Sequence, residues 1–249
     1  MGDFMKKGLY LSLNLKTLSV AVFSAVLIAS GIACVRYASL SVATANISRN
    51  KPAIIVDAGH GGIDAGTQSA AGVLEKDINL CISIKLGNML SLAGYEVIYT
   101  RESDSINYPD ECVSIRQKKV WDIHRRMETM QAAPDAIFLS IHQNYFTESV
   151  YSGAQMFYSG NNPESKIIAD SIQKAVVCNL QPDNDRQIKK SGTEIYLLYH
   201  AKNPAVMVEC GFLSNEKEAQ LLNDDSYQSK LALSIFQGLE QYLSGKKEI

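Results

Sequence analysis

The chain has 249 residues, of which 46% are hydrophobic and 20% charged, as in an ordinary globular protein with a hydrophobic core. Its formal net charge of -2 leaves no excess of lysine and arginine, which argues against nucleic acid as a partner. Five cysteines form no CxxC pair and no pattern of a small disulfide-rich scaffold, so buried free thiols are expected.

The first predicted element is an apolar segment at residues 17–35, which contains no charged side chain. Its length is close to the roughly 20 residues that cross a bilayer as a helix. Lysines precede it, which predicts a cytoplasmic N-terminus and export of the residues that follow. The segment could persist as a signal anchor or be removed as a signal peptide after Ala45. The length of the run favours the anchor.

The chain is expected to have three parts: a cytoplasmic stub with the apolar segment at 1–36, a Ser-, Ala- and Asn-rich linker at 37–51, and one folded domain at 52–245. Strands and amphipathic helices alternate through this domain. The pattern predicts an α/β fold, a single domain with a mixed, largely parallel twisted sheet flanked by helices, as in phosphorylase- and hydrolase-like domains. Strands are expected at 53–57, 96–100, 136–142, 154–158, 194–198 and 206–209, and helices at 78–93, through 121–127, at 168–180 and at 231–243.

Polar side chains stand where several of these strands end. His60 follows the first strand across a glycine, His142 ends the third, and Glu209 ends a later one, while Glu75 lies on the loop entering the first long helix. Ligands of open α/β sheets gather at the carboxyl ends of the strands, so these residues are expected to converge. The glycines around His60 form neither GxGxxG nor a P-loop, which argues against a phosphate site.

Two imidazoles and one carboxylate with an open fourth position are a ligand set of catalytic zinc. A further carboxylate could then act as general base. Asp57 and Asn144 are placed to orient ligands or substrate. The alternative is that both histidines are hydrogen-bonded structural residues. His124 and His200 are expected to be surface or core residues rather than ligands. Cys210 is a second alternative, as a nucleophile, although cysteines are usually buried.

The motifs that contain these residues recur in order along the domain. They are IIVDAGHGGIDAGT (54–67), LEKD (74–77), TR (100–101), SIHQN (140–144), SGAQMFY (152–158) and PAVMVECGFLSN (204–215). Together they resemble the amidase_3 family of cell-wall hydrolases. The resemblance implies a Zn²⁺-dependent hydrolase that cleaves the amide between N-acetylmuramic acid and L-alanine in peptidoglycan. It also implies that His60, Glu75 and His142 bind the metal and that Glu209 is the general base.

The anchor and the single compact domain resemble the spore-cortex amidases of the CwlD type, which remove stem peptides so that muramic-δ-lactam can form. That resemblance implies a role in sporulation and germination, with the catalytic domain on the outer side of a bacterial membrane, as in the forespore intermembrane space. An activating protein partner stays open, because no residue identifies one. Two rival hypotheses are an inactive peptidoglycan-binding or activator module, and a zinc peptidase or deacetylase acting on the cell wall.

Overall fold

The computed structural model describes Leu18, residues 22–24 and 26–34, and residues 51–245. The chain divides into two compact units, Met1–Asn50 and Lys51–Ile249. The predicted membrane segment lies partly outside the described residues, as does nearly all of the predicted linker, and the described part of that segment is helical. Within the described ranges, we find no helix whose length and apolarity would carry it across a bilayer.

The second unit is built on a six-stranded sheet with the strand order β2-β1-β3-β6-β4-β5. The first four strands in this order run parallel to one another, whereas β4 runs antiparallel to β6. The prediction of an α/β fold with a mixed, largely parallel sheet is therefore confirmed. The strands are β1 (Ile54–Ala58), β2 (Val97–Tyr99), β3 (Ile137–Asn144), β4 (Gln155–Tyr158), β5 (Lys189–Lys190) and β6 (Ala205–Phe212).

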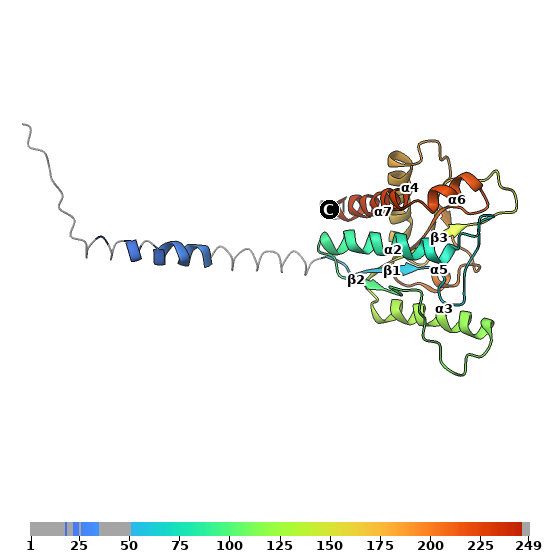
Figure 1. Ribbon diagram of the computed structural model, residues 1–249, viewed down its shortest axis with the longest axis horizontal. Helices are drawn as coiled ribbons and strands as arrows, with labels where there is room; N and C mark the ends of the chain where they lie inside the picture. The colour runs from blue at the N-terminus through green and yellow to red at the C-terminus, as the bar shows by residue number, and fades with distance from the viewer. Residues whose placement is uncertain (1–17, 19–21, 25, 35–50, 246–249) are drawn as a thin grey trace, which may run out of the picture. The chain divides into compact units, whose positions relative to one another are not determined.

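Helices pack on both faces of this sheet (Figure 1). One hydrophobic cluster joins the sheet to α2, α4 and α7, and a second cluster joins the opposite face to α3 and α5. The inner strand β1 is fully buried because it packs against both clusters, as expected for an inner parallel strand. The helices are α2 (Glu75–Leu92), α3 (Ile115–Ala132), α4 (Pro163–Asn179), α5 (Tyr196–His200), α6 (Glu216–Leu222) and α7 (Asp225–Gly245).

Local sequence signals explain where several helices begin and end. Ser114 and Gln117 form a capping box at the start of α3, and Asn162 caps α4 ahead of Pro163. Gly94 has a φ of 83° just after α2, which is the left-handed conformation that glycine adopts most readily at a helix end. This agrees with the end predicted for the first long helix.

One predicted strand is wrong. Residues 194–198 do not form a strand, because Tyr196–His200 is the short helix α5. Its consecutive residues Leu197 and Leu198 are both buried in the cluster beneath α3. Short apolar runs do not distinguish a strand from a buried helical turn by periodicity alone. The edge strand β5 and the helix α6 were not predicted, and Glu75 lies in the first turn of α2 rather than on the loop before it.

Candidate metal centre

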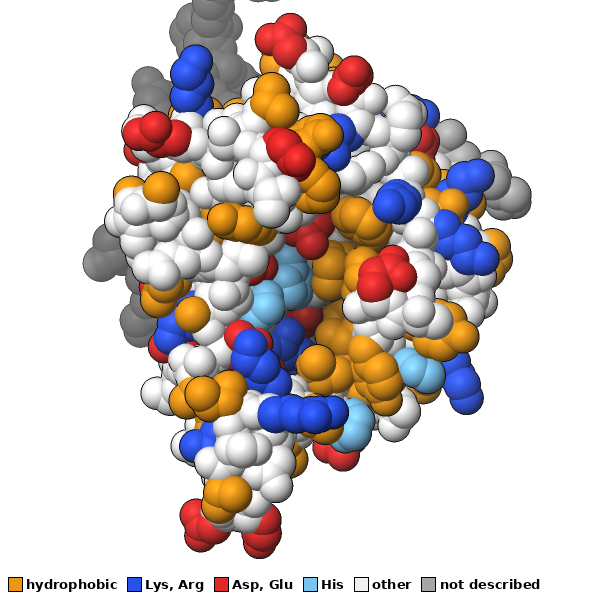
Figure 2. Space-filling view, turned by 90° about the vertical axis from the view of Figure 1, so that its right-hand side faces the viewer, with side chains coloured by type: hydrophobic (Ala, Val, Ile, Leu, Met, Phe, Trp, Pro, Cys, Tyr) orange, Lys and Arg blue, Asp and Glu red, His pale blue; other side chains and the backbone are white. Residues whose placement is uncertain are grey.

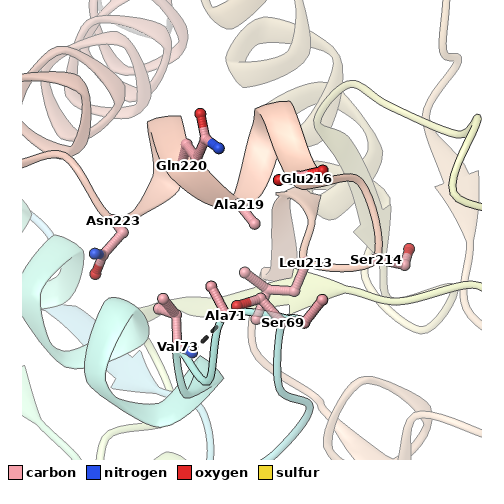
Figure 3. A pocket seen from close by; sticks show the side chains of 10 residues that line it. Ser69, Ala71, Val73, Leu213, Ser214, Glu216, Ala219, Gln220 and Asn223 are labelled. Atoms are coloured by element: carbon pink, nitrogen blue, oxygen red, sulfur yellow. Dashed lines mark hydrogen bonds between the residues drawn. The ribbon is translucent and has the colours of Figure 1, made fainter.

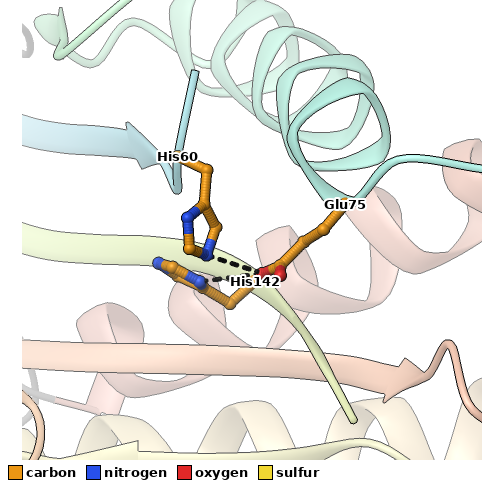
Figure 4. A group of neighbouring side chains, drawn as sticks. All are labelled: His60, Glu75 and His142. Atoms are coloured by element: carbon orange, nitrogen blue, oxygen red, sulfur yellow. Dashed lines mark hydrogen bonds and ion pairs between the residues drawn. The ribbon is translucent and has the colours of Figure 1, made fainter. Parts of the chain in front are cut away.

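The candidate metal ligands come together from three separate segments of the chain. His60 lies two residues beyond β1, His142 lies near the end of β3, and Glu75 is the first residue of α2. One ligand atom from each of them lies within 4.8 Å of the other two (Figure 4). Figure 2 shows histidine side chains in a hollow of the surface, with hydrophobic side chains along one of its sides. The convergence expected at this edge of the sheet is therefore present.

The two distances from Glu75 to the histidines are close to those between donor atoms on a small tetrahedral ion. Glu75 Oε1 lies 3.3 Å from His60 Nε2 and 3.0 Å from His142 Nδ1, and the two imidazole rings meet edge to face. Donor atoms bonded to zinc at about 2.0–2.1 Å in a tetrahedron lie roughly 3.3 Å apart. Two nitrogen donors and one carboxylate oxygen also match the donor types that zinc prefers. The residues present therefore fit a zinc ion.

A second layer of polar groups orients the candidate ligands. Asp64 accepts a hydrogen bond from His60 Nδ1 at 2.9 Å, which leaves Nε2 directed toward Glu75, and Lys119 pairs with the same carboxylate at 2.7 Å. Thr67 donates to Glu75 Oε2 through its backbone N–H at 2.8 Å and its hydroxyl at 3.1 Å. Carboxylates that hold metal-binding imidazoles in this way fix both the tautomer and the ring orientation.

These supporting residues were missed by reasoning from the sequence, although Asp64 and Thr67 lie in the same glycine-rich motif as His60. An aspartate four residues after a candidate histidine ligand was the available signal for Asp64. No local pattern singled out Lys119, because its contact with the site depends on how α3 packs.

The contacts among the candidate ligands raise the pKa of His60 and lower the pKa of Glu75. Burial by itself would lower the pKa of His60, but its hydrogen bonds to Asp64 and Glu75 raise that pKa to about 9. Burial opposes ionisation of Glu75, yet the hydrogen bonds from His142 and His60 hold its pKa well below the usual range. Glu75 is therefore an anion that attracts cations, and a metal ion would compete with protons for the imidazoles.

Glu209 stands beside the candidate ligands on the neighbouring strand. It pairs in register with His142 across β3 and β6, so the two side chains project from the same face of the sheet. Its Oε2 is buried and has no hydrogen-bond partner among the described residues. Burial raises the pKa of Glu209 to about 7. A carboxyl group in this state can take up or release a proton near neutral pH.

Asp57 and Asn144, the other two predicted site residues, differ in burial and in their hydrogen-bond partners. Asp57 is fully buried, accepts hydrogen bonds from Thr100 at 2.7 Å and Ser140 at 2.6 Å, and lies 3.7 Å from the Arg126 guanidinium. This burial favours an orienting role over contact with substrate. Asn144 is half-buried at the end of β3, where its side chain accepts from the backbone of Tyr145 at 2.8 Å.

Cys210 lies in the hydrophobic core and is fully buried. Burial raises the pKa of its thiol, so the thiolate that a nucleophile requires is disfavoured. This position gives no support to the alternative in which Cys210 attacks the substrate. His124 and His200 are exposed, as expected for residues outside the metal site.

The glycine before His60 allows close approach of the backbone to His142. A Cβ atom at Gly59 would overlap the His142 imidazole, so only glycine leaves room for that ring.

A separate pocket of about 350 Å³ lies between the turn at 69–73 and α6 (Figure 3). None of the three candidate ligands lines it. The metal centre itself therefore lies in the hollow rather than in this pocket.

Comparisons with known proteins agree on one family. The model of the Amidase_3 family, N-acetylmuramoyl-L-alanine amidase, matches residues 54–241. A germination-specific N-acetylmuramoyl-L-alanine amidase of Bacillus subtilis is 35% identical over 193 residues, which are 78% of this chain and 80% of that protein.

Solved structures of amidases are also similar to this chain. The CwlD amidase from Clostridioides difficile, solved in complex with the GerS lipoprotein, is 42% identical with a TM-score of 0.75, covering 78% of this chain and all of that one. An N-acetylmuramoyl-L-alanine amidase from Clostridium difficile 630 is 30% identical with a TM-score of 0.64, covering 79% and 99% of the two chains.

Proposed function

Because the chain belongs to the Amidase_3 family and is an N-acetylmuramoyl-L-alanine amidase acting on peptidoglycan, we propose that it cleaves this substrate at a zinc site formed by His60, Glu75 and His142. The observation that carries the proposal is the convergence of these three side chains beside the buried, unpartnered carboxyl oxygen of Glu209. The scissile bond is the amide between the lactyl group of N-acetylmuramic acid and L-alanine.

The proposed role of each residue follows from the position of its side chain. When bound, zinc supplies Lewis acidity and lowers the pKa of a water molecule toward 7. Glu209 accepts the proton of the attacking water and delivers it to the leaving amine of L-alanine. Asp64 and Thr67 hold His60 and Glu75 in position through the hydrogen bonds described above. Asp57 supports the strand ends from which His60 and His142 project.

Mass analysis of purified peptidoglycan after digestion tests the bond that is cleaved. We expect intact stem peptides with a free L-alanine amino group, and glycan strands that keep their acetyl groups. Shortened peptides would instead identify a peptidase, and loss of acetyl groups a deacetylase. A preparation that binds zinc but releases no peptide would favour an inactive binding module.

We propose further that the enzyme acts on the spore cortex. Similarity to the germination-specific amidase of Bacillus subtilis and to CwlD supports this role. A Bacillus subtilis strain that lacks its germination-specific amidase provides the test. Expression of this chain should restore muramic-δ-lactam to the cortex, measured by muropeptide analysis, whereas the Glu209→Gln variant should not. Absence of the lactam despite active enzyme in the spore would refute the cortex role.

The proposed location is the outer side of a bacterial membrane, with residues 1–36 as anchor, 37–51 as linker and 52–245 as the catalytic domain. The uncharged run at 17–35 and the lysines before it support this arrangement. The protein should remain in the membrane pellet after alkaline extraction, and a chain beginning at Lys51 should be soluble. An activating protein partner is proposed as well, because the similar CwlD amidase was solved with the GerS lipoprotein.

A further inference from the structure

His60 has an unusual backbone conformation for a candidate metal ligand. Its φ is 61°, and among the described residues it is the one residue other than glycine with a positive φ. Side chains with a Cβ disfavour this left-handed region, so surrounding contacts must hold the residue there. The conformation turns the His60 carbonyl into the protein while the imidazole faces Glu75. The contacts of that carbonyl therefore bear on where the ligand lies.

Two arginines hold three consecutive carbonyl groups of this loop. Arg101 donates from Nε to Ala58 O at 3.0 Å and from Nη2 to Gly59 O at 3.1 Å. Arg126, on α3, donates from Nη2 to His60 O at 3.0 Å. Hydrogen bonds from a charged donor are stronger than those between neutral groups. Of these two arginines, Arg126 is the one that contacts the histidine itself.

The burial of the Arg126 guanidinium is energetically unfavourable. Its side chain is almost fully buried, pairs with Asp122 at 2.5 Å and lies 3.7 Å from Asp57. Its Nε is buried and has no hydrogen-bond partner among the described residues. A buried donor without a partner is unfavourable and calls for an explanation. Placement of the guanidinium to reach both Asp122 and the His60 carbonyl provides one.

We propose that Arg126 is a positioning residue for the metal site, which holds His60 in its left-handed conformation and so directs Nε2 toward the ion. The inference rests on the proposed zinc site. Asp122 fixes the guanidinium from the same helix, and the guanidinium fixes the carbonyl of the ligand. Arg126 acts through His60 and contacts neither metal nor substrate. Its loss should therefore weaken zinc binding more than it weakens the fold.

The test compares zinc affinity in two matched variants, Arg126→Lys and Arg125→Lys. Lysine keeps the positive charge beside Asp122, but its ammonium is one bond nearer the backbone than the guanidinium nitrogens and is expected to fall short of the His60 carbonyl. Arg125 is the neighbouring residue and also pairs with Asp122, at 2.8 Å, but its other bond goes to Thr100 O rather than to His60. Competition with a chromogenic chelator gives the zinc affinity, and thermal unfolding of the metal-free proteins reports the fold.

We expect Arg126→Lys to bind zinc about 10- to 100-fold more weakly than the parent, the range typical for loss of a group that orients a ligand. Arg125→Lys should bind within about twofold of the parent. Excess zinc should restore turnover to Arg126→Lys, which a general loss of structure would not allow. Parent affinity in a folded Arg126→Lys variant would overturn the proposal, as would equal weakening in both variants.

If Arg126→Lys does not fold, Asp122→Asn decides the question. This substitution removes the carboxylate that orients the guanidinium and should weaken zinc binding, whereas unchanged affinity would overturn the proposal. Failure of the parent protein to bind zinc would refute the proposed metal site. That outcome is distinct from failure of the Arg126 role, which requires a parent that binds zinc normally.

Discussion

Replacement of Glu209 by glutamine separates catalysis from metal binding and from stability. Glutamine has nearly the same shape as glutamate but cannot accept the proton of the attacking water at neutral pH. A positioned general base contributes typically 10²- to 10⁴-fold, so kcat should fall by about that factor. Zinc affinity should stay near that of the parent, because Glu209 is not among the three grouped candidate ligands. Release of stem peptides from purified peptidoglycan measures the first effect, and chelator competition the second.

The same substitution should change how stability depends on pH. Burial raises the pKa of Glu209 from an ordinary 4.5 to about 7 in the folded protein. The difference between these values corresponds to about 3 kcal/mol, at 1.36 kcal/mol for each tenfold change in proton affinity. Below pH 4.5 the carboxyl is protonated in both folded and unfolded chains. Between pH 4.5 and about 7 the carboxyl ionises in the unfolded chain but stays protonated in the folded one, so the free energy of unfolding of the parent falls by about 3 kcal/mol over this range. The glutamine variant has no titrating group at this position.

Denaturant unfolding of the two metal-free proteins at several pH values is the assay. Relative to the parent, the variant should gain about 3 kcal/mol between pH 4.5 and pH 8. An unpartnered amide N–H costs the variant about 1–3 kcal/mol, but this cost does not depend on pH. Glu216→Gln, at the exposed first residue of α6, is the matched control and should alter neither activity nor this dependence.

Two results would refute the reasoning separately. Near-normal peptide release by a folded Glu209→Gln variant would show that another group moves the proton. Parallel pH dependences of stability in parent and variant would show that burial does not perturb the Glu209 carboxyl.

Three further predictions concern the metal and its surroundings. Dialysis against a chelator should abolish peptide release and lower the melting temperature, and added Zn²⁺ should restore both; activity that survives complete zinc removal, checked by elemental analysis, contradicts the zinc site. Gly59→Ala should reduce zinc affinity at least tenfold in chelator competition, because its Cβ overlaps the His142 imidazole, and unchanged affinity would contradict the close approach. Asp57→Asn should destabilise the fold by about 3–5 kcal/mol near pH 7, because it leaves Arg126 partly unpaired. Burial opposes ionisation of Asp57, but Arg126 and the hydroxyl donors lower its pKa, so its contribution is present above about pH 4 and lost in acid; denaturant unfolding should show the variant and parent converging at low pH.

Much of the fold could be predicted from local patterns. The apolar runs that became β1 and β3, and the helical periodicity of α2, α4 and α7, follow from burial against a sheet and are visible along the chain. The pattern failed at Tyr196–His200, where two adjacent leucines suit either a strand or a short buried helix. Packing beneath α3 decided between them.

The sequence by itself also identified the four polar residues of the proposed site, because each lies in an ordered motif and three of them stand near strand ends. It did not identify Arg126, which lies 66 positions from His60 and in the middle of a helix. The hydrogen bond between Glu75 and His142 joins residues 67 positions apart, and the sequence predicted that they converge but not that they touch. Spacing along the chain encodes which face of a helix or strand a residue occupies. Contacts between elements arise only when the sheet forms and the helices pack on it, so the distances among ligands, and the groups that hold them, were decided by the tertiary structure.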